Sequence, residues 1–236
     1  MLNIILARND FDVALDLLIN DFPYAIWETL YATIISTFFA VIIGLPLGIL
    51  LVVGEKNNIL PLPKPVLTFL NWLINIFRSI PFIILMVLVL PLSKIIVGTK
   101  LGTIATIVPL VIAAAPFIAR LIESSIREIN PNTIEAALSM GASPFQIIIH
   151  VLIPESMPSI VGNITIAFTT ILGYTAMSGA VGGGGLGRIA ISYGYQRFNT
   201  PVMILAVVFI VLLVIIFQSL GTYISKKMDR RIRNKA

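Results

Sequence analysis

The chain has 236 residues, a mean hydropathy of +1.01 and only 11% charged residues, whereas soluble domains carry roughly a quarter. These values exclude a water-soluble globular domain and indicate that the lipid bilayer surrounds the chain. The absence of cysteine excludes a disulfide framework and thiolate chemistry. The net charge of +5 is split among short loops and a tail, which is typical of membrane topology rather than of nucleic-acid binding.

Residues 1–24 precede the first long apolar run and are predicted to form an extracytoplasmic extension. Four apolar side chains fall on one face of a possible helix here: Phe11, Leu15, Leu18 and Ile19. The pattern fits an interfacial anchor and a weakly ordered extension equally well. The apolar run that follows is too long for a signal peptide and lacks an A-x-A cleavage pattern, so we interpret it as a retained span.

Five apolar segments are predicted to be transmembrane helices, because each is near the roughly 20 residues that cross the hydrocarbon core. They cover residues 25–53, 66–92, 101–119, 160–181 and 201–224. Gly44 to Gly48, with Pro46 between them, should bend the first span. The expected fold class is an all-α integral membrane protein, with one transmembrane domain over residues 25–225 and a basic tail over 226–236.

The second apolar segment has two interpretations, because Arg78-Ser79-Ile80-Pro81 interrupts it. One long helix can carry an arginine near its inner end. Alternatively, residues 66–77 lie along the interface and the span begins at Ile80. The second interpretation is favoured, because an arginine deep in lipid costs several kcal/mol.

The basic residues predict the orientation. Ten lie on the side of the tail, namely Lys56, Lys64, Arg120, Arg127, Lys226, Lys227, Arg230, Arg231, Arg233 and Lys235. Five lie on the opposite side, namely Arg8, Lys94, Lys100, Arg188 and Arg197. The positive-inside rule therefore predicts a cytoplasmic C-terminus and an external N-terminus.

About 40 residues separate the third and fourth spans, which is more than a simple connection needs. The first part of this loop is predicted to be a short helix. Asn132 can cap it, with Glu135 at its third position. Gly141 should end it, because glycine adopts the left-handed conformation of a helix C-terminus.

A second short helix should follow at once. Ser143 can cap it, with Pro144 at its first position and Gln146 at its third, and Pro154 and Pro158 are expected to end it. The pair presents small apolar residues, namely Ala136, Ala137, Met140 and Phe145. Docking into the groove of a partner and packing against the protein's own inner face are equally consistent with this pattern.

Residues 135–154 also match a known motif. Glu135-Ala136-Ala137, three residues, Gly141, nine residues and an I-x-L-P-like end at Pro154 resemble the EAA loop of ABC importer permeases, with Val151 and Ile153 in place of Ile and Leu. The resemblance implies a coupling helix that sits in a cleft of a cytoplasmic ATPase. The residues that it implicates are Glu135, Ala136, Ala137, Gly141, Pro144 and Pro154.

Further stretches indicate which group of ABC importer permeases the chain resembles. They are WETL at 27–30, FRSIPF at 77–82, APFIAR at 115–120 and GYTAMSGAVG at 173–182. Together they resemble the permease subunit of methionine-uptake ABC importers, over nearly everything after residue 24. This implies a homodimer in the bacterial cell membrane, two copies of an ATPase that bind ATP and Mg, and an extracytoplasmic substrate-binding lipoprotein. The chain itself would be a transport subunit rather than a hydrolase.

Two stretches near the end of the fourth span have competing interpretations. The run GGGGLG at 182–187 lacks the Gly-Lys-Ser/Thr ending of a phosphate loop, so we expect either a flexible outer turn or a hinge.

Small polar residues in the span itself often hydrogen-bond a neighbouring helix. The family resemblance instead implies a gate on the translocation path, at Tyr174, Met177 and Ser178.

No catalytic, cofactor or metal site is predicted. His150 is the only histidine and has no cysteine or carboxylate cluster around its position, so we expect it on the surface. Arg78 and Arg120 should reach the inner headgroups or pair with Glu123 or Glu128. The alternatives to methionine import are another amino acid or a compatible solute in the same superfamily, and an ATP-independent carrier, which would require ionisable residues in mid-span.

Overall fold

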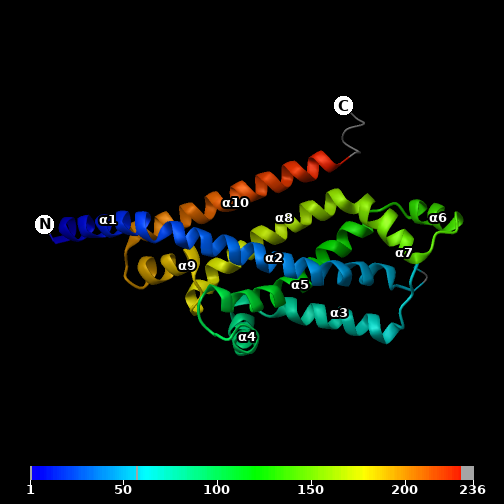
Figure 1. The fold of residues 1–236 in the computed structure, drawn as a ribbon, viewed down its shortest axis with the longest axis horizontal. Helices are drawn as coiled ribbons and strands as arrows, with labels where there is room; N and C mark the ends of the chain where they lie inside the picture. Colours follow the sequence, from blue (N-terminus) through cyan, green and yellow to red (C-terminus); the bar gives the residue numbers. More distant parts are fainter. Residues whose placement is uncertain (1, 57, 230–236) are drawn as a thin grey trace. The chain divides into compact units, whose positions relative to one another are not determined.

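The computed structural model describes residues 2–56 and 58–229, with side chains from residue 10 onward. All of the secondary structure in these residues is helical, which confirms the predicted class (Figure 1). The α-helices are α1 Leu2–Asn20, α2 Phe22–Val53, α3 Lys64–Ser79, α4 Phe82–Val97, α5 Thr103–Arg127, α6 Pro131–Ser139, α7 Pro144–Ile147, α8 Ile153–Ser178, α9 Gly185–Ile189 and α10 Thr200–Met228. Three other helical segments are η1 Ile148–Leu152, η2 Gly179–Val181 and η3 Ala190–Tyr195.

The described helices agree with the predicted number of spans. Four stretches are long and apolar enough to cross a membrane: α2, α5, Pro144–Val181 and α10. A fifth arises if the broken pair α3 and α4 is taken as one span. The break lies at Ile80, whose backbone is extended (φ −80°, ψ 126°), and α4 begins at Phe82. The break lies where the sequence interrupts the segment, but α3 packs along α2 and α5, so the choice between the two interpretations stays a prediction.

The chain divides into two compact units. The first comprises Met1–Phe38, Pro81–Ala113 and Phe168–Phe217, and the second comprises Phe39–Ile80, Ala114–Ala167 and Gln218–Ala236. Several long helices therefore contribute to both units.

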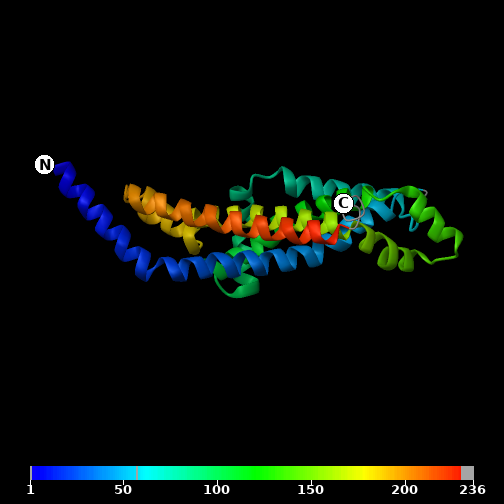
Figure 2. The same cartoon turned by 90° about the horizontal axis from the view of Figure 1, so that it is seen from above.

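In the first unit, a core cluster joins α1, the start of α2, α9 and the start of α10. It contains Ala14, Leu17, Phe22, Ala25, Leu186, Ile189, Val202 and Ala206. Helix α9 and the start of α10 lie side by side in both views (Figures 1 and 2). The N-terminal helix packs on this core through Ala14 and Leu17, while Phe11 and Ile19 from the predicted apolar face remain exposed.

In the second unit, α3 packs on α2 and α5 through Leu51, Ile74 and Ala119. Helix α2 also approaches α5 closely. A Cβ atom on Gly44 would lie 2.8 Å from Ile118 Cγ2, and one on Gly48 would lie 2.5 Å from the Ala119 carbonyl oxygen. Small residues four apart commonly permit such contact between membrane helices. Helix α2 continues unbroken through Pro46, so these glycines serve helix packing.

Several helices extend beyond the segments predicted as spans. Helix α5 continues past residue 119 to Arg127, because its charged residues pair at helical spacing: Arg120 and Arg127 both bind Glu123. Helix α10 continues to Met228. Helix α8 begins at Ile153 rather than near 160. The pairing of Arg120 with Glu123 confirms one of the two partners predicted for that arginine.

We expect Gly48→Ala to destabilise the protein by roughly 1–3 kcal/mol, because the added methyl group would press on backbone of α5 that cannot rotate away. The matched control is Gly162→Ala in α8, where a Cβ atom would meet only the Ser225 side chain, with Oγ the nearer atom at 3.4 Å. Thermal unfolding of the purified protein in detergent measures both variants. Equal melting temperatures for the two would contradict the close packing of α2 on α5.

Candidate functional site

Helix α6 forms the first arm of an elbow, defined here as residues 130–154. Asn130 caps it, since its side-chain oxygen accepts a hydrogen bond from the Asn132 N–H at 3.0 Å. The prediction of Asn132 as the cap was wrong, because Pro131 has no N–H and fits the first helical position. Gly141 ends the arm as predicted: its φ is +79°, and its N–H donates to the Leu138 carbonyl at 2.9 Å.

Helix α7 forms the second arm and has the predicted capping box. The Ser143 hydroxyl accepts from the Gln146 N–H at 3.4 Å, and Gln146 Oε1 accepts from the Ser143 N–H at 2.8 Å. Pro144 occupies the first turn. The two arms meet at a tight turn (Figures 1 and 2).

The second arm does not end at Pro154 or Pro158, and that prediction was wrong. It passes through the π-helical segment η1 into α8, which contains Pro158. A proline removes one backbone hydrogen bond, and a helix with other support bends rather than ends there. The support here is burial, because Ile147 and Leu152 are almost completely inaccessible. The elbow is therefore joined to the membrane helix without a loop.

The elbow exposes large apolar side chains among its polar ones. Met140 is 81% exposed, Phe145 is 70% exposed and Leu138 is 47% exposed. Glu135 and Ala136 are also exposed, whereas Ala137, which was predicted on this face, is buried beneath it. Single exposed apolar residues are common on proteins, whereas several large ones on one short elbow favour an interaction surface.

His150 lies on the surface, as predicted, with Nδ1 3.2 Å from the Gln146 carbonyl oxygen. Among the described residues, no group of three or more His, Cys, Asp or Glu side chains could hold a metal ion.

The three residues predicted for the gate lie near the C-terminus of α8 in different surroundings. Tyr174 stacks face to face on Phe82 of α4, with ring centroids 4.1 Å apart. Met177 is 43% exposed. Ser178 is buried, and its hydroxyl donates to the Thr175 carbonyl at 2.7 Å. Only Met177 thus has a largely accessible side chain, while Phe82 fixes the ring of Tyr174.

The sequence reasoning missed a carboxylate clamp beside this end of α8. Glu28 Oε1 accepts from the Thr103 hydroxyl of α5 at 2.7 Å, and Oε2 accepts from the Gly185 N–H at 2.8 Å. The neighbouring Thr29 Oγ1 accepts from the Leu186 N–H at 2.9 Å. One turn of α2 therefore holds both α5 and the first residues of α9. The sequence feature that could have indicated the clamp is an acidic residue at the start of an apolar span, which is Glu28 in the stretch WETL.

The glycine run at 182–187 packs into this clamp. Gly182 and Gly185 have φ values of +88° and +74°, which favour glycine. A side chain on Gly184 would overlap the Thr103 hydroxyl and the Glu28 carboxylate. The Gly102 N–H also donates to the Gly182 carbonyl at 2.8 Å. The run is a packed joint rather than an open loop.

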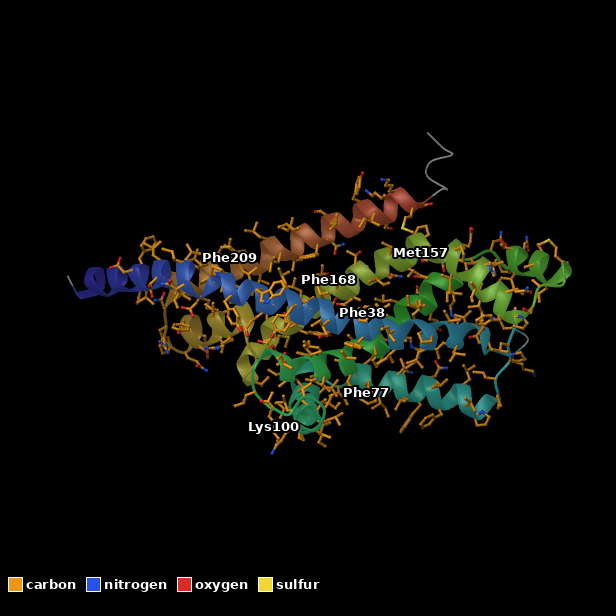
Figure 3. The ribbon with its side chains drawn as sticks, viewed as in Figure 1. Phe38, Phe77, Lys100, Met157, Phe168 and Phe209 are labelled. Carbon is orange, nitrogen blue, oxygen red and sulfur yellow. The ribbon has the colours of Figure 1, made fainter. Side chains whose placement is uncertain are left out.

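Basic side chains lie near the glycine joint. Lys100 projects from the turn before α5 (Figure 3) and is exposed. Arg188 of α9 is exposed as well, and Arg197 covers the ring of Tyr193 at 4.3 Å. These are three of the five basic residues that the sequence placed outside.

Comparisons with known proteins give a consistent result. Residues 44–230 match the family described as binding-protein-dependent transport system inner membrane component. The chain is 46% identical over 207 residues to the probable D-methionine transport system permease protein MetI of Vibrio cholerae, covering 88% of this chain and 92% of that protein. It is 48% identical over 168 residues to the methionine import system permease protein MetP of Bacillus subtilis, covering 71% and 76%.

A solved structure is similar to the chain as well. In an inward-facing form of the MetNI methionine ABC transporter, one chain is 46% identical to this one, with a TM-score of 0.86. The match covers 89% of this chain and 96% of that one.

We expect Glu28→Ala to lower stability by about 1–3 kcal/mol, because it leaves the Thr103 hydroxyl and the Gly185 N–H without their acceptor in a mostly buried place. The control is Glu135→Ala, which removes an exposed carboxylate and should leave stability unchanged. Thermal unfolding in detergent compares them. A Glu28→Ala variant as stable as the control would show that the clamp contributes nothing to the fold.

Proposed function

Because the chain belongs to the family of binding-protein-dependent transport system inner membrane components, we propose that it is the membrane permease subunit of an ATP-driven methionine importer. It is not an enzyme, and a separate ATPase subunit hydrolyses ATP. That partner binds the ATP and Mg, and this chain supplies the path through the inner membrane.

The elbow is the observation that carries this proposal. Both of its arms are capped by their own side chains, and its outer surface offers Met140 and Phe145 to a groove on the ATPase. The coupling residues are Glu135, Ala136, Ala137, Gly141, Pro144 and Pro154. Because α7 runs through η1 into α8, a displacement of the elbow moves a membrane helix directly.

The assembly contains a second copy of the chain, two copies of the ATPase and an extracytoplasmic binding lipoprotein that delivers the substrate. Identical subunits close most simply around a two-fold axis. The N-terminal extension lies outside and the tail in the cytoplasm. The positive-inside rule supports this orientation, because the unit that contains the elbow also contains Lys56, Arg127, Lys226 and the basic tail.

Tyr174, Met177 and Ser178 form the gate on the translocation path. An exposed thioether is flexible and polarisable, which suits contact with the unbranched, sulfur-containing side chain of methionine. The stack of Tyr174 on Phe82 holds the ring at one place on α8. ATP binding and hydrolysis change the populations of two access states, and this chain supplies the element that changes state.

Reconstitution tests the function directly. Proteoliposomes that contain the chain, its ATPase and its binding protein should take up radiolabelled methionine only when ATP is present. Unlabelled L- and D-methionine should compete, whereas glycine betaine should not. Uptake by the chain without the ATPase would exclude an ABC importer, and competition by glycine betaine alone would exclude methionine as the substrate.

We expect Gly141→Asp to reduce co-purification of the ATPase at least about tenfold, which corresponds to about 1.4 kcal/mol of binding free energy. The change places a charge and backbone strain at the turn of the elbow. Gly98→Asp is a matched control, because Gly98 also has a left-handed φ, of +82°, and open space around a Cβ atom, but it ends α4. Equal ATPase recovery with both variants would remove Gly141 from the docking surface.

A further inference from the structure

One carboxylate in the second unit binds two arginines. Glu123 Oε2 accepts from Arg120 Nη1 at 2.6 Å, and Glu123 Oε1 accepts from Arg127 Nη2 at 2.9 Å. Arg127 Nη2 also donates to Glu55 Oε1 at 2.6 Å. The four residues carry two positive and two negative charges, so the group is neutral as a whole. We call these four residues the charge network.

The charge network joins α5 to two other segments of the same unit. Arg120 Nη2 donates to Asn71 Oδ1 at 2.9 Å and to Asn75 Oδ1 at 3.0 Å, both on α3. Glu55 lies in the turn that follows α2. The amide of Asn71 is oriented by its own bond to the Leu67 carbonyl, at 2.9 Å. Helix α3 and the end of α2 are thus held to one face of α5.

The network lies directly before the elbow. Helix α5 ends at Arg127, Ile129 is buried, and Asn130 caps α6. Only two residues separate the last arginine from the cap. A displacement of the first arm therefore acts on Arg127 without passing through a flexible connection.

The two halves of the network differ in accessibility. The Arg120 and Glu123 side chains are 21% and 13% exposed, whereas those of Arg127 and Glu55 are 44% and 42% exposed. An ion pair as accessible as the second contributes little to stability and can open and close readily. A charge as shielded as Glu123 is costly to leave without a partner. The shielded half can therefore keep α3 on α5 while the accessible half opens.

We propose that Glu123 is a positioning residue for transport: it holds Arg120 against α3, so that α3 moves with the inner end of α5 and the elbow. The inference rests on the proposed function, because it requires the elbow to be moved by the ATPase. Glu123 acts through the arginines that it binds rather than on the substrate. Its role is to make one rigid body of α3, the inner end of α5 and the first arm.

The first test compares Glu123→Gln with Glu128→Gln. Both remove one carboxylate near the end of α5, and Glu128 is exposed and forms no ion pair with any side chain that the structure describes in residues 10–56 and 58–229. In proteoliposomes with the ATPase and binding protein, Glu123→Gln should lower methionine transported per ATP hydrolysed by about fivefold or more. Basal ATPase activity and complex recovery should stay at the wild-type level, as should every value for Glu128→Gln.

The second test measures motion, and the cysteine-free sequence makes it direct. Spin labels on cysteines at exposed Thr68 of α3 and exposed Ser139 of α6 report the distance between α3 and the elbow. In the otherwise unchanged complex this distance should be the same without nucleotide and with trapped ATP. In Glu123→Gln it should change between the two states, because α3 no longer follows the elbow.

A variant on the other side of the contact guards against misfolding of Glu123→Gln. Asn71→Ala with Asn75→Ala removes the acceptors on α3, leaves the charges in place and should reproduce the loss of coupling. Suppose that the wild-type complex transports methionine with ATP, but that Glu123→Gln and Glu128→Gln give the same amount of methionine per ATP and the same distances between the spin labels. The inference is then wrong and the proposed function stands. If the wild-type complex shows no ATP-dependent transport, the proposed function itself fails.

Discussion

A backbone N–H or carbonyl group in hydrocarbon has no water to bind, so each must find a partner within the protein. This requirement explains why the described residues form long helices, and why polar side chains lie at two of their interruptions. At the joint after α8, Glu28 and Thr29 accept from the free N–H groups of Gly185 and Leu186. Before α10, the Asn199 side chain accepts from the Val202 N–H and donates to the Asp10 carbonyl. Both of these interruptions are thus also contacts between helices distant in sequence.

The same requirement makes the helices stiff, and stiff helices can transmit a displacement of the elbow. Its arms are stabilised locally by Asn130, Gly141 and Ser143, and they continue into α5 on one side and α8 on the other with almost no irregular chain. A packed interior resists continuous deformation. Movement at the elbow is therefore passed on as displacement of whole helices, which is what a permease driven by a separate motor needs.

Sequence reasoning succeeded where the physics is local. Hydropathy located the spans, and Ser143 with Gln146 and the left-handed Gly141 were predictable because their partners lie within a few residues. It failed where a local rule competes with packing. Pro154 and Pro158 were expected to end a helix, yet buried neighbours carry it onward. The Glu28 clamp was missed because Thr103 lies 75 positions away and Gly185 lies 157 away.

The accessibility of Met140 and Phe145 has a consequence before any transport begins. Under the proposed docking, a newly inserted chain that has not met its motor subunit presents two large apolar side chains to the aqueous phase. Such surface promotes aggregation and recognition by chaperones and proteases. Under the same proposal, copies in excess of the motor subunit are the vulnerable ones.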